Sequence, residues 1–192
     1  MMRNLYDWTM NFARHRHAMW ALAIVAFIES SVFPIPPDVL IIPMVIAAPH
    51  KAWRIAAVAT LASVLGGCLG YVIGAGFMET LGQPILEFYG KADKFDALAA
   101  RFNEIGGWAV LIAGITPFPY KVITIFSGVT NLSFPLFLGI SVIARALRFF
   151  IVAGLLWKFG APIRDFIERR LGVILSVSLV VFIAGFYAVR YL

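Results

Sequence analysis

The sequence predicts an all-α integral membrane protein built as an inverted repeat, in which a re-entrant helical hairpin plus a transmembrane helix occurs twice. Hydrophobic residues make up 61% of the 192 residues and charged residues 14%, and the mean hydropathy is +0.90. This composition is typical of chains that span a membrane. Two apolar segments are each interrupted by prolines, and each is followed by an uninterrupted apolar stretch. We therefore expect one membrane domain over 1–192, with an amphipathic N-terminal helix and a C-terminal transmembrane helix.

The first repeat is expected over 18–78, after an amphipathic helix over 1–17. Its apolar run is broken at 29–38, where prolines interrupt the helix. At about 1.5 Å per residue, the arms 18–33 and 38–48 would span roughly 24 Å and 16 Å, short of the ~30 Å of a hydrocarbon core. A re-entrant hairpin, which enters and leaves on one face, is therefore predicted. The prolines of this break are Pro34, Pro36 and Pro37.

A full transmembrane helix is expected over 55–78, at the end of the first repeat. Small residues recur on it every four positions, at Gly66, Gly70 and Gly74. Such a stripe lets another helix backbone approach closely. We interpret it as a helix-packing face, and a role in lining a lipid path is compatible with that packing.

The second repeat is expected over 105–160, after a polar segment at 79–104 that would lie along the membrane interface. Two short arms flank a break at 116–122, and a full span over 134–157 follows. The arms would cover about 18 Å and 14 Å, so a second re-entrant hairpin is predicted. Residues 161–192 would form a basic amphipathic segment and the last span. The prolines of the second break are Pro117 and Pro119.

The two breaks match at an offset of 83 residues. A hairpin plus one span crosses the membrane an odd number of times, so the second copy must enter from the opposite face, as in many inverted-repeat membrane proteins. With a cytoplasmic N-terminus, nine of the 16 Lys and Arg residues lie on the cytoplasmic side and four on the other. This distribution satisfies the positive-inside rule. The matched pairs are Pro34 with Pro117, Pro36 with Pro119, and Val39 with Val122.

Five ionisable residues are predicted at membrane depth, where charge is costly and commonly functional. They are Glu29, Asp38, Lys121, Arg145 and Arg148. Asp38 could instead cap the second arm of its hairpin or pair with Lys121, and the two arginines share a helix face and could be structural. Their net charge of +1 would suit one anionic headgroup. Glu29 has no cap to provide and is the candidate for binding a functional proton.

These features resemble the DedA family, also called the VTT or SNARE-associated-Golgi-like domain, and within it the small YqaA-type branch. The resemblance rests on Glu29 and Asp38 around Pro-x-Pro-Pro, on the glycine pattern at 70–74, and on the second proline-containing hairpin, and it covers roughly 18–160. It implies two facing re-entrant hairpins and lipid translocation, with undecaprenyl phosphate or phospholipids as substrates and proton dependence in some bacterial members. It also implies that the two acids are the family's membrane-embedded carboxylates.

The second hairpin departs from the family pattern. Many members carry Arg-x-x-Pro-x-x-Arg there, whereas this chain has Thr116-x-x-Pro119-x-Lys121. A lysine is a point charge without the bidentate fork of arginine. Arg145 and Arg148 are candidates to compensate for the missing arginines.

We therefore expect a transporter that moves a lipid headgroup across the bacterial inner membrane, with protons as a candidate second partner. A proton-coupled small-solute carrier and a non-catalytic scaffold or assembly factor are the alternatives. An enzyme is not expected, because the three histidines have no catalytic or metal-ligand spacing. No nucleotide-binding loop is present, so ATP-driven transport by this chain alone is not expected. No cofactor is expected, and the basic excess has no soluble face to bind nucleic acid. An oligomer is compatible with the sequence.

Overall fold

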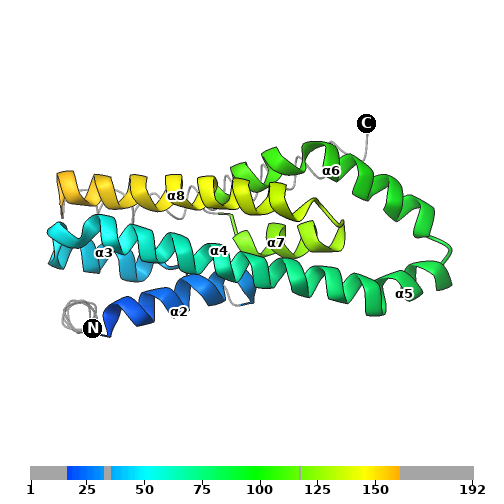
Figure 1. Cartoon of the computed structure of the whole chain (residues 1–192), viewed down its shortest axis with the longest axis horizontal. Coiled ribbons are helices and arrows are strands. Elements are labelled where there is room, and N and C mark those ends of the chain that lie inside the picture. Colours follow the sequence, from blue (N-terminus) through cyan, green and yellow to red (C-terminus); the bar gives the residue numbers. More distant parts are fainter. Residues whose placement is uncertain (1–16, 33–35, 117, 161–192) are drawn as a thin grey trace, which may run out of the picture.

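The computed structural model describes residues 17–32, 36–116 and 118–160, and every regular element in these ranges is helical (Figure 1). Three helical stretches are long and apolar enough to cross a membrane. The N-terminal amphipathic helix and the C-terminal span predicted above lie outside the described residues. The three long stretches are Pro49–Phe88, Ala92–Ile115 and Phe134–Phe159.

The first proline break separates two short apolar helices, α2 (Ala18–Ser31) and α3 (Asp38–Ala47). Their bounds agree closely with the predicted arms 18–33 and 38–48. Proline fixes its own backbone torsion and cannot donate a hydrogen bond, so a run of prolines ends α2. Pro37 then occupies the N-cap position of α3.

A long helix follows through the single turn η1 (Pro49–Lys51). Helix α4 (Ala52–Phe77) continues without a break through the π-helical turn η2 (Met78–Gly82) into α5 (Gln83–Phe88). The whole stretch has 40 residues. The predicted span 55–78 is therefore the middle of a longer helix.

The second half contains α6 (Ala92–Ile115), α7 (Tyr120–Val129) and α8 (Phe134–Phe159). The sequence boundary predicted near residue 105 is wrong, because α6 runs through it without interruption. The polar segment 79–104 is thus no separate interfacial helix: it forms the end of the α4–α5 stretch and the first half of α6. No backbone signal separates the polar half of α6 from its apolar half.

The helices form an elongated bundle in which α4 and α8 run in opposite directions (Figure 1). Helix α2 packs on α4, and α6 packs on α8; α7 also packs on α4, and α3 contacts α8. Each short helix after a break therefore contacts the long helix of the other half. The α5–α6 turn lies at one end of the long axis, whereas α2 and α3 lie toward the other (Figure 1).

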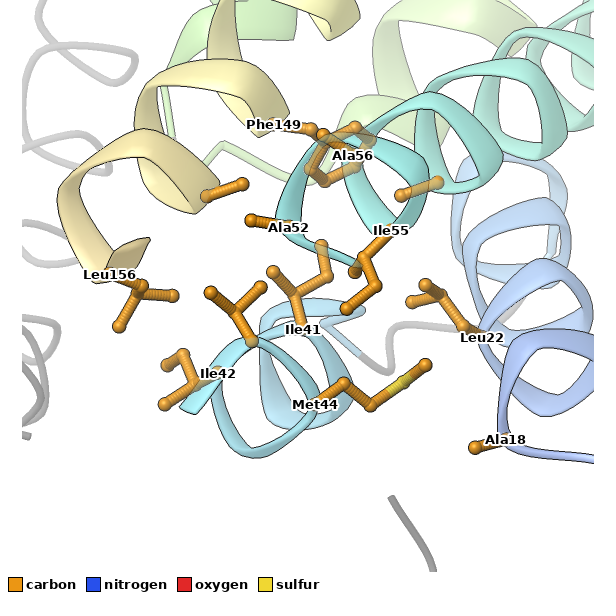
Figure 2. Packing of buried hydrophobic residues seen from close by; sticks show 13 residues of the cluster. Ala18, Leu22, Ile41, Ile42, Met44, Ala52, Ile55, Ala56, Phe149 and Leu156 are labelled. Carbon is orange, nitrogen blue, oxygen red and sulfur yellow. The ribbon is translucent and has the colours of Figure 1, made fainter. Parts of the chain in front are cut away.

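One apolar core lies between α2, α3, α4 and α8 (Figure 2). Ile41 of α3 lies among side chains of α4, while Leu22 of α2 and Leu156 of α8 close the two sides of the cluster (Figure 2). Small residues of α4 belong to this core: Ala52 and Ala56 are fully buried, and Ala56 lies beside Phe149 of α8 (Figure 2). A second core joins α4, α6, α7 and α8 around Tyr71, Tyr120 and Phe137.

The glycine stripe of α4 forms the closest helix contacts. A Cβ atom at Gly66 would overlap the carbonyl of Phe27 in α2, and one at Gly74 would overlap the carbonyl of Ile125 in α7. Gly70 faces the hydroxyl of Thr124. The stripe thus places α2 and α7 side by side on α4.

Large apolar side chains also cover the outside of the bundle, including Leu61, Leu65 and Val72 on α4 and Ile143 and Ile151 on α8. Water would make such a surface unfavourable, whereas lipid chains are a suitable solvent for it. Together with the three long apolar helices, this surface is that of an integral membrane protein.

Candidate functional site

Arg145 lies at the centre of α8 and is almost completely buried, with 1% of its surface exposed. Its Nη2 donates to Oε2 of Glu29 at 2.9 Å, and its Nε donates to the hydroxyl of Ser63 at 2.5 Å. Its guanidinium carbon also lies 4.7 Å from the centroid of the Tyr120 ring and 4.6 Å from that of Phe149. A buried cation is tolerated only when its charge and donors are matched in this way.

Glu29 belongs to a closed ring of four hydrogen-bonded side chains. The hydroxyl of Ser30 donates to Glu29 at 3.1 Å and lies 2.6 Å from the hydroxyl of Ser63, which accepts from Arg145. Because Ser63 accepts from the guanidinium, its own proton is free to point to Ser30. The ring therefore links the end of α2 to the middles of α4 and α8.

Arg148 lies three residues further along α8, on the same face as Arg145. Its Nη2 donates to Oδ2 of Asp38 at 2.8 Å, and its Nη1 donates to the backbone carbonyl of Thr116. Its buried Nε has no hydrogen-bond partner among the described residues. Asp38 begins α3 and Thr116 is the C-cap of α6, so this one side chain joins the first break to the second.

Lys121 makes the reciprocal connection. Its Nζ donates to the carbonyl of Val32, the C-cap of α2, at 3.1 Å. The hydroxyl of Thr124, also on α7, donates to the carbonyl of Ser30 at 3.0 Å. The last carbonyls of a helix lack partners within the helix, and cations stabilise them. Lys121 and Arg148 thus satisfy the ends of α2 and α6, respectively.

Two alternatives left open by the sequence are wrong. Asp38 makes no side-chain capping bond to α3, whose N-cap is Pro37; its carboxylate binds Arg148 instead. For the same reason Asp38 is not the partner of Lys121, which binds a backbone carbonyl. A guanidinium reaching from α8 competes better for the carboxylate than the neighbouring backbone does, because the pair is charge-assisted on both sides.

The structure thus brings all five predicted ionisable residues to the place where the two breaks meet. Of the predicted prolines, Pro36 and Pro37 precede α3, and Pro119 is the N-cap of α7. Pro34 and Pro117 lie outside the described residues.

Sequence reasoning missed the uncharged partners at this junction. Ser63, Ser30 and Thr124 bind the charged groups or the helix ends, and the hydroxyl of Tyr120 donates to Ser141 at 2.6 Å behind the Arg145 guanidinium. Hydroxyl side chains are common in membrane helices, so they give no signal by type alone. The three-residue spacing of Ser63 from Gly66 could have placed it beside the packing face.

Cations outnumber carboxylates at this junction. Three cations and two carboxylates form two ion pairs, and Lys121 is left on a neutral carbonyl. Within 17–32, 36–116 and 118–160, no group of three His, Cys, Asp or Glu side chains could hold a metal ion. A guanidinium that already binds a carboxylate can bind a phosphate with the same planar fork.

The bundle is apolar outside, and its interrupted helices meet at buried ion pairs. These features are those of a polytopic membrane protein with a polar centre. The VTT domain, the domain of the DedA family, matches residues 35–158. The chain therefore belongs to the DedA family of VTT-domain proteins.

Similar proteins occur in bacteria. An uncharacterized protein of Haemophilus influenzae is 39% identical over 168 residues, which cover 85% of this chain and 87% of that protein. An uncharacterized protein of Histophilus somni is 39% identical over 183 residues, covering 93% and 95% of the two chains. An uncharacterized membrane protein of Mycobacterium leprae is 26% identical over 114 residues, covering 59% and 47%. No solved structure matches significantly.

Proposed function

We propose that this protein translocates an anionic lipid headgroup across the bacterial inner membrane and performs no chemical reaction on it. The observation that carries the proposal is the cluster of two ion pairs and a lysine at the meeting point of two broken helical segments. Charges inside an apolar bundle are costly, and in membrane proteins they commonly mark a ligand site or a pathway. Membership of the DedA family supports the same conclusion.

The second support is the repeated layout. In each half a short helix of 10 residues follows the break, and a helix of 26 residues follows the short one. Helices α4 and α8 run in opposite directions. We interpret the halves as an inverted repeat of re-entrant hairpin plus transmembrane helix, the design in which substrate sites lie where broken helices meet.

A lipid fits this site better than a soluble molecule of the same charge. Only the headgroup needs a polar path, because its acyl or prenyl chains can remain against the apolar outer faces of α4 and α8. A phosphate offers several acceptor oxygens, and arginine binds such groups through two parallel donors. Undecaprenyl phosphate and phospholipids are the candidate substrates.

Proton coupling follows from the competition between carboxylate and phosphate. Protonating Asp38 would remove the negative charge that holds Arg148, and Arg148 would then be available to an anion. Protons entering from one side would thereby favour headgroup binding on that side.

The test is reconstitution of the purified protein into liposomes with labelled undecaprenyl phosphate or labelled phospholipids, with and without a pH gradient. Protein-dependent movement of one of these lipids to the opposite leaflet is the expected result. Movement of neither lipid, combined with proton-linked uptake of a small solute, would favour a solute carrier. Absence of any transport, with function in cells surviving neutral replacement of the buried charges, would favour a scaffold.

A further inference from the structure

The two ion pairs at the junction have very different surroundings. Arg145 exposes 1% of its side chain and Arg148 exposes 13%, whereas the exposures of their acidic partners are nearly equal, at 11% for Glu29 and 10% for Asp38. The difference between the pairs therefore comes from the arginines.

Arg145 is held on every side. Two aromatic rings, from Tyr120 and Phe149, cover its guanidinium, and its Nε and Nη2 are bonded to Ser63 and Glu29. Glu29 receives a further hydrogen bond from Ser30. Releasing Arg145 would break this ring and leave a buried charge without a partner.

Arg148 is held less completely. Its buried Nε has no partner, and neither Phe149 nor any other ring is recorded against its guanidinium among the described residues. A buried donor without an acceptor is rare and marks a position that a different ligand could satisfy better. The Nε–Nη edge of a guanidinium is one of the edges that bind phosphate through two parallel bonds.

Lys121 adds the second half of an anion site. It belongs to the same break as Thr116, whose carbonyl Arg148 binds. Among the described residues, the Lys121 ammonium uses one of its three N–H donors, in the bond to Val32. It is also the cation left over when the two ion pairs are counted. A phosphate held by Arg148 and Lys121 would neutralise this excess charge.

From these differences, and resting on the proposed function, we infer that the pairs have separate roles. Arg145–Glu29 is a fixed link between α8 and α2. Arg148 is the exchanging cation: it leaves Asp38 and binds the phosphate of the headgroup together with Lys121. Since Arg148 also joins the first break to Thr116 in the second, the exchange loosens the junction while Arg145 keeps the halves together.

Binding can be measured without transport, on the full chain in detergent. The probes are short-chain phosphatidic acid, inorganic phosphate, and short-chain phosphatidylcholine, whose phosphate is paired with an internal cation. The variants are Arg148→Gln, Arg148→Lys, Asp38→Asn and Lys121→Gln. Arg54→Gln is the matched control, because Arg54 is an exposed cation at the end of α4 away from the junction.

For Arg148→Gln, binding of phosphatidic acid should weaken by about ten- to hundredfold, the range for losing a charge-assisted pair of hydrogen bonds. Arg148→Lys keeps the charge but loses the fork, so its binding should be intermediate, and it serves if the glutamine variant does not fold. Asp38→Asn should bind about three- to tenfold more tightly, because the competing carboxylate is gone. Damage to the fold would not tighten binding.

Equal binding by Arg148→Gln and Arg54→Gln would overturn the inference, and so would weaker binding by Asp38→Asn. Preference for phosphatidic acid over inorganic phosphate identifies a lipid headgroup as the ligand, whereas equal affinity identifies free phosphate and overturns the lipid assignment. Failure of the liposome assay with the binding pattern intact would reject the proposed transport but not the anion site. Transport by Arg148→Gln at the wild-type rate would reject this inference alone.

Discussion

The two halves of the bundle have helices of matching length, but they contribute charges of opposite sign to their junction. Their short helices have 10 residues each and their long helices 26 each. The first half contributes both carboxylates of the junction, Glu29 and Asp38, and the second half contributes all three cations. Neither half could neutralise its own charges at the junction. Each ion pair must therefore form between the halves.

This difference shows how a symmetric scaffold can have one specific assembled state. Equal helix lengths alone would allow the halves to slide against each other, because apolar surfaces in lipid have little preference for register. In the assembled state Arg145 binds Glu29 and Arg148 binds Asp38, so each arginine has one carboxylate partner in the first half. The charge asymmetry thus fixes the register that the repeat leaves free.

Arg145→Met should damage this assembly most. The substitution leaves Glu29 buried without its cation, and breaking a buried pair from one side costs about 3–5 kcal/mol. The unfolding temperature of the purified protein in detergent should fall steeply.

The double variant Glu29→Gln with Arg145→Met removes both charges and is the control. It should recover much of the lost stability, since no unpaired charge remains. Equal instability of the single and double variants would show that packing around Arg145, rather than the pair, determines the effect.

Gly74→Leu should weaken the contact between the halves by a different route. A Cβ at Gly74 meets the backbone of α7 at Ile125, and Gly128 of α7 in turn meets the carbonyl of Tyr71 in α4. The larger side chain must push the helices apart, at about 1–3 kcal/mol for an overpacked core. Thermal unfolding measures the loss.

Gly76→Leu is the matched control on the same helix, because nothing lies within 4 Å of a Cβ at Gly76. It should be close to neutral. If both variants lose stability equally, the added side chain itself rather than the α4–α7 contact is responsible, since leucine is the better helix former.

Lys121→Met should have the smallest effect of the three. It keeps the length of the side chain but leaves the Val32 carbonyl without its donor, which corresponds to about 0.5–1.5 kcal/mol for one hydrogen bond. Lys94→Met, at an exposed position of α6, is the comparison and should not change the unfolding temperature. A loss as large as that of Arg145→Met would contradict the unequal roles assigned to the cations.

Much of the fold could be predicted because prolines and apolar length are local signals. The break after Ser31 and the start of α3 at Asp38 follow directly from the proline run, and α8 begins at Phe134 as expected. The continuity of α6 could not be predicted in this way. Its polarity changes at mid-helix, and a change in side-chain polarity does not require a change in the backbone.

The members of the site could be predicted, but their pairing could not. Intramembrane charges are conspicuous in an apolar sequence, whereas the partner of each depends on how α8 crosses α2 and α3. The offset of 83 residues suggested Asp38 with Lys121, because it relates equivalent positions of the repeat. Equivalent positions need not touch, and Arg148, which has no acidic neighbour on its own helix, takes the carboxylate instead.

The unbroken helix from Pro49 to Phe88 has a consequence for the shape of the protein at the membrane surface. Forty residues extend about 60 Å, twice the ~30 Å of the hydrocarbon core. About half of that length must stand in the headgroups and the water, with the turn at Gly90 at its tip. The projecting turn is a suitable position for an epitope label. With the N-terminus in the cytoplasm, an epitope inserted at Gly90 should be reached by antibody from the periplasm in spheroplasts, and labelling only after lysis would reverse the orientation.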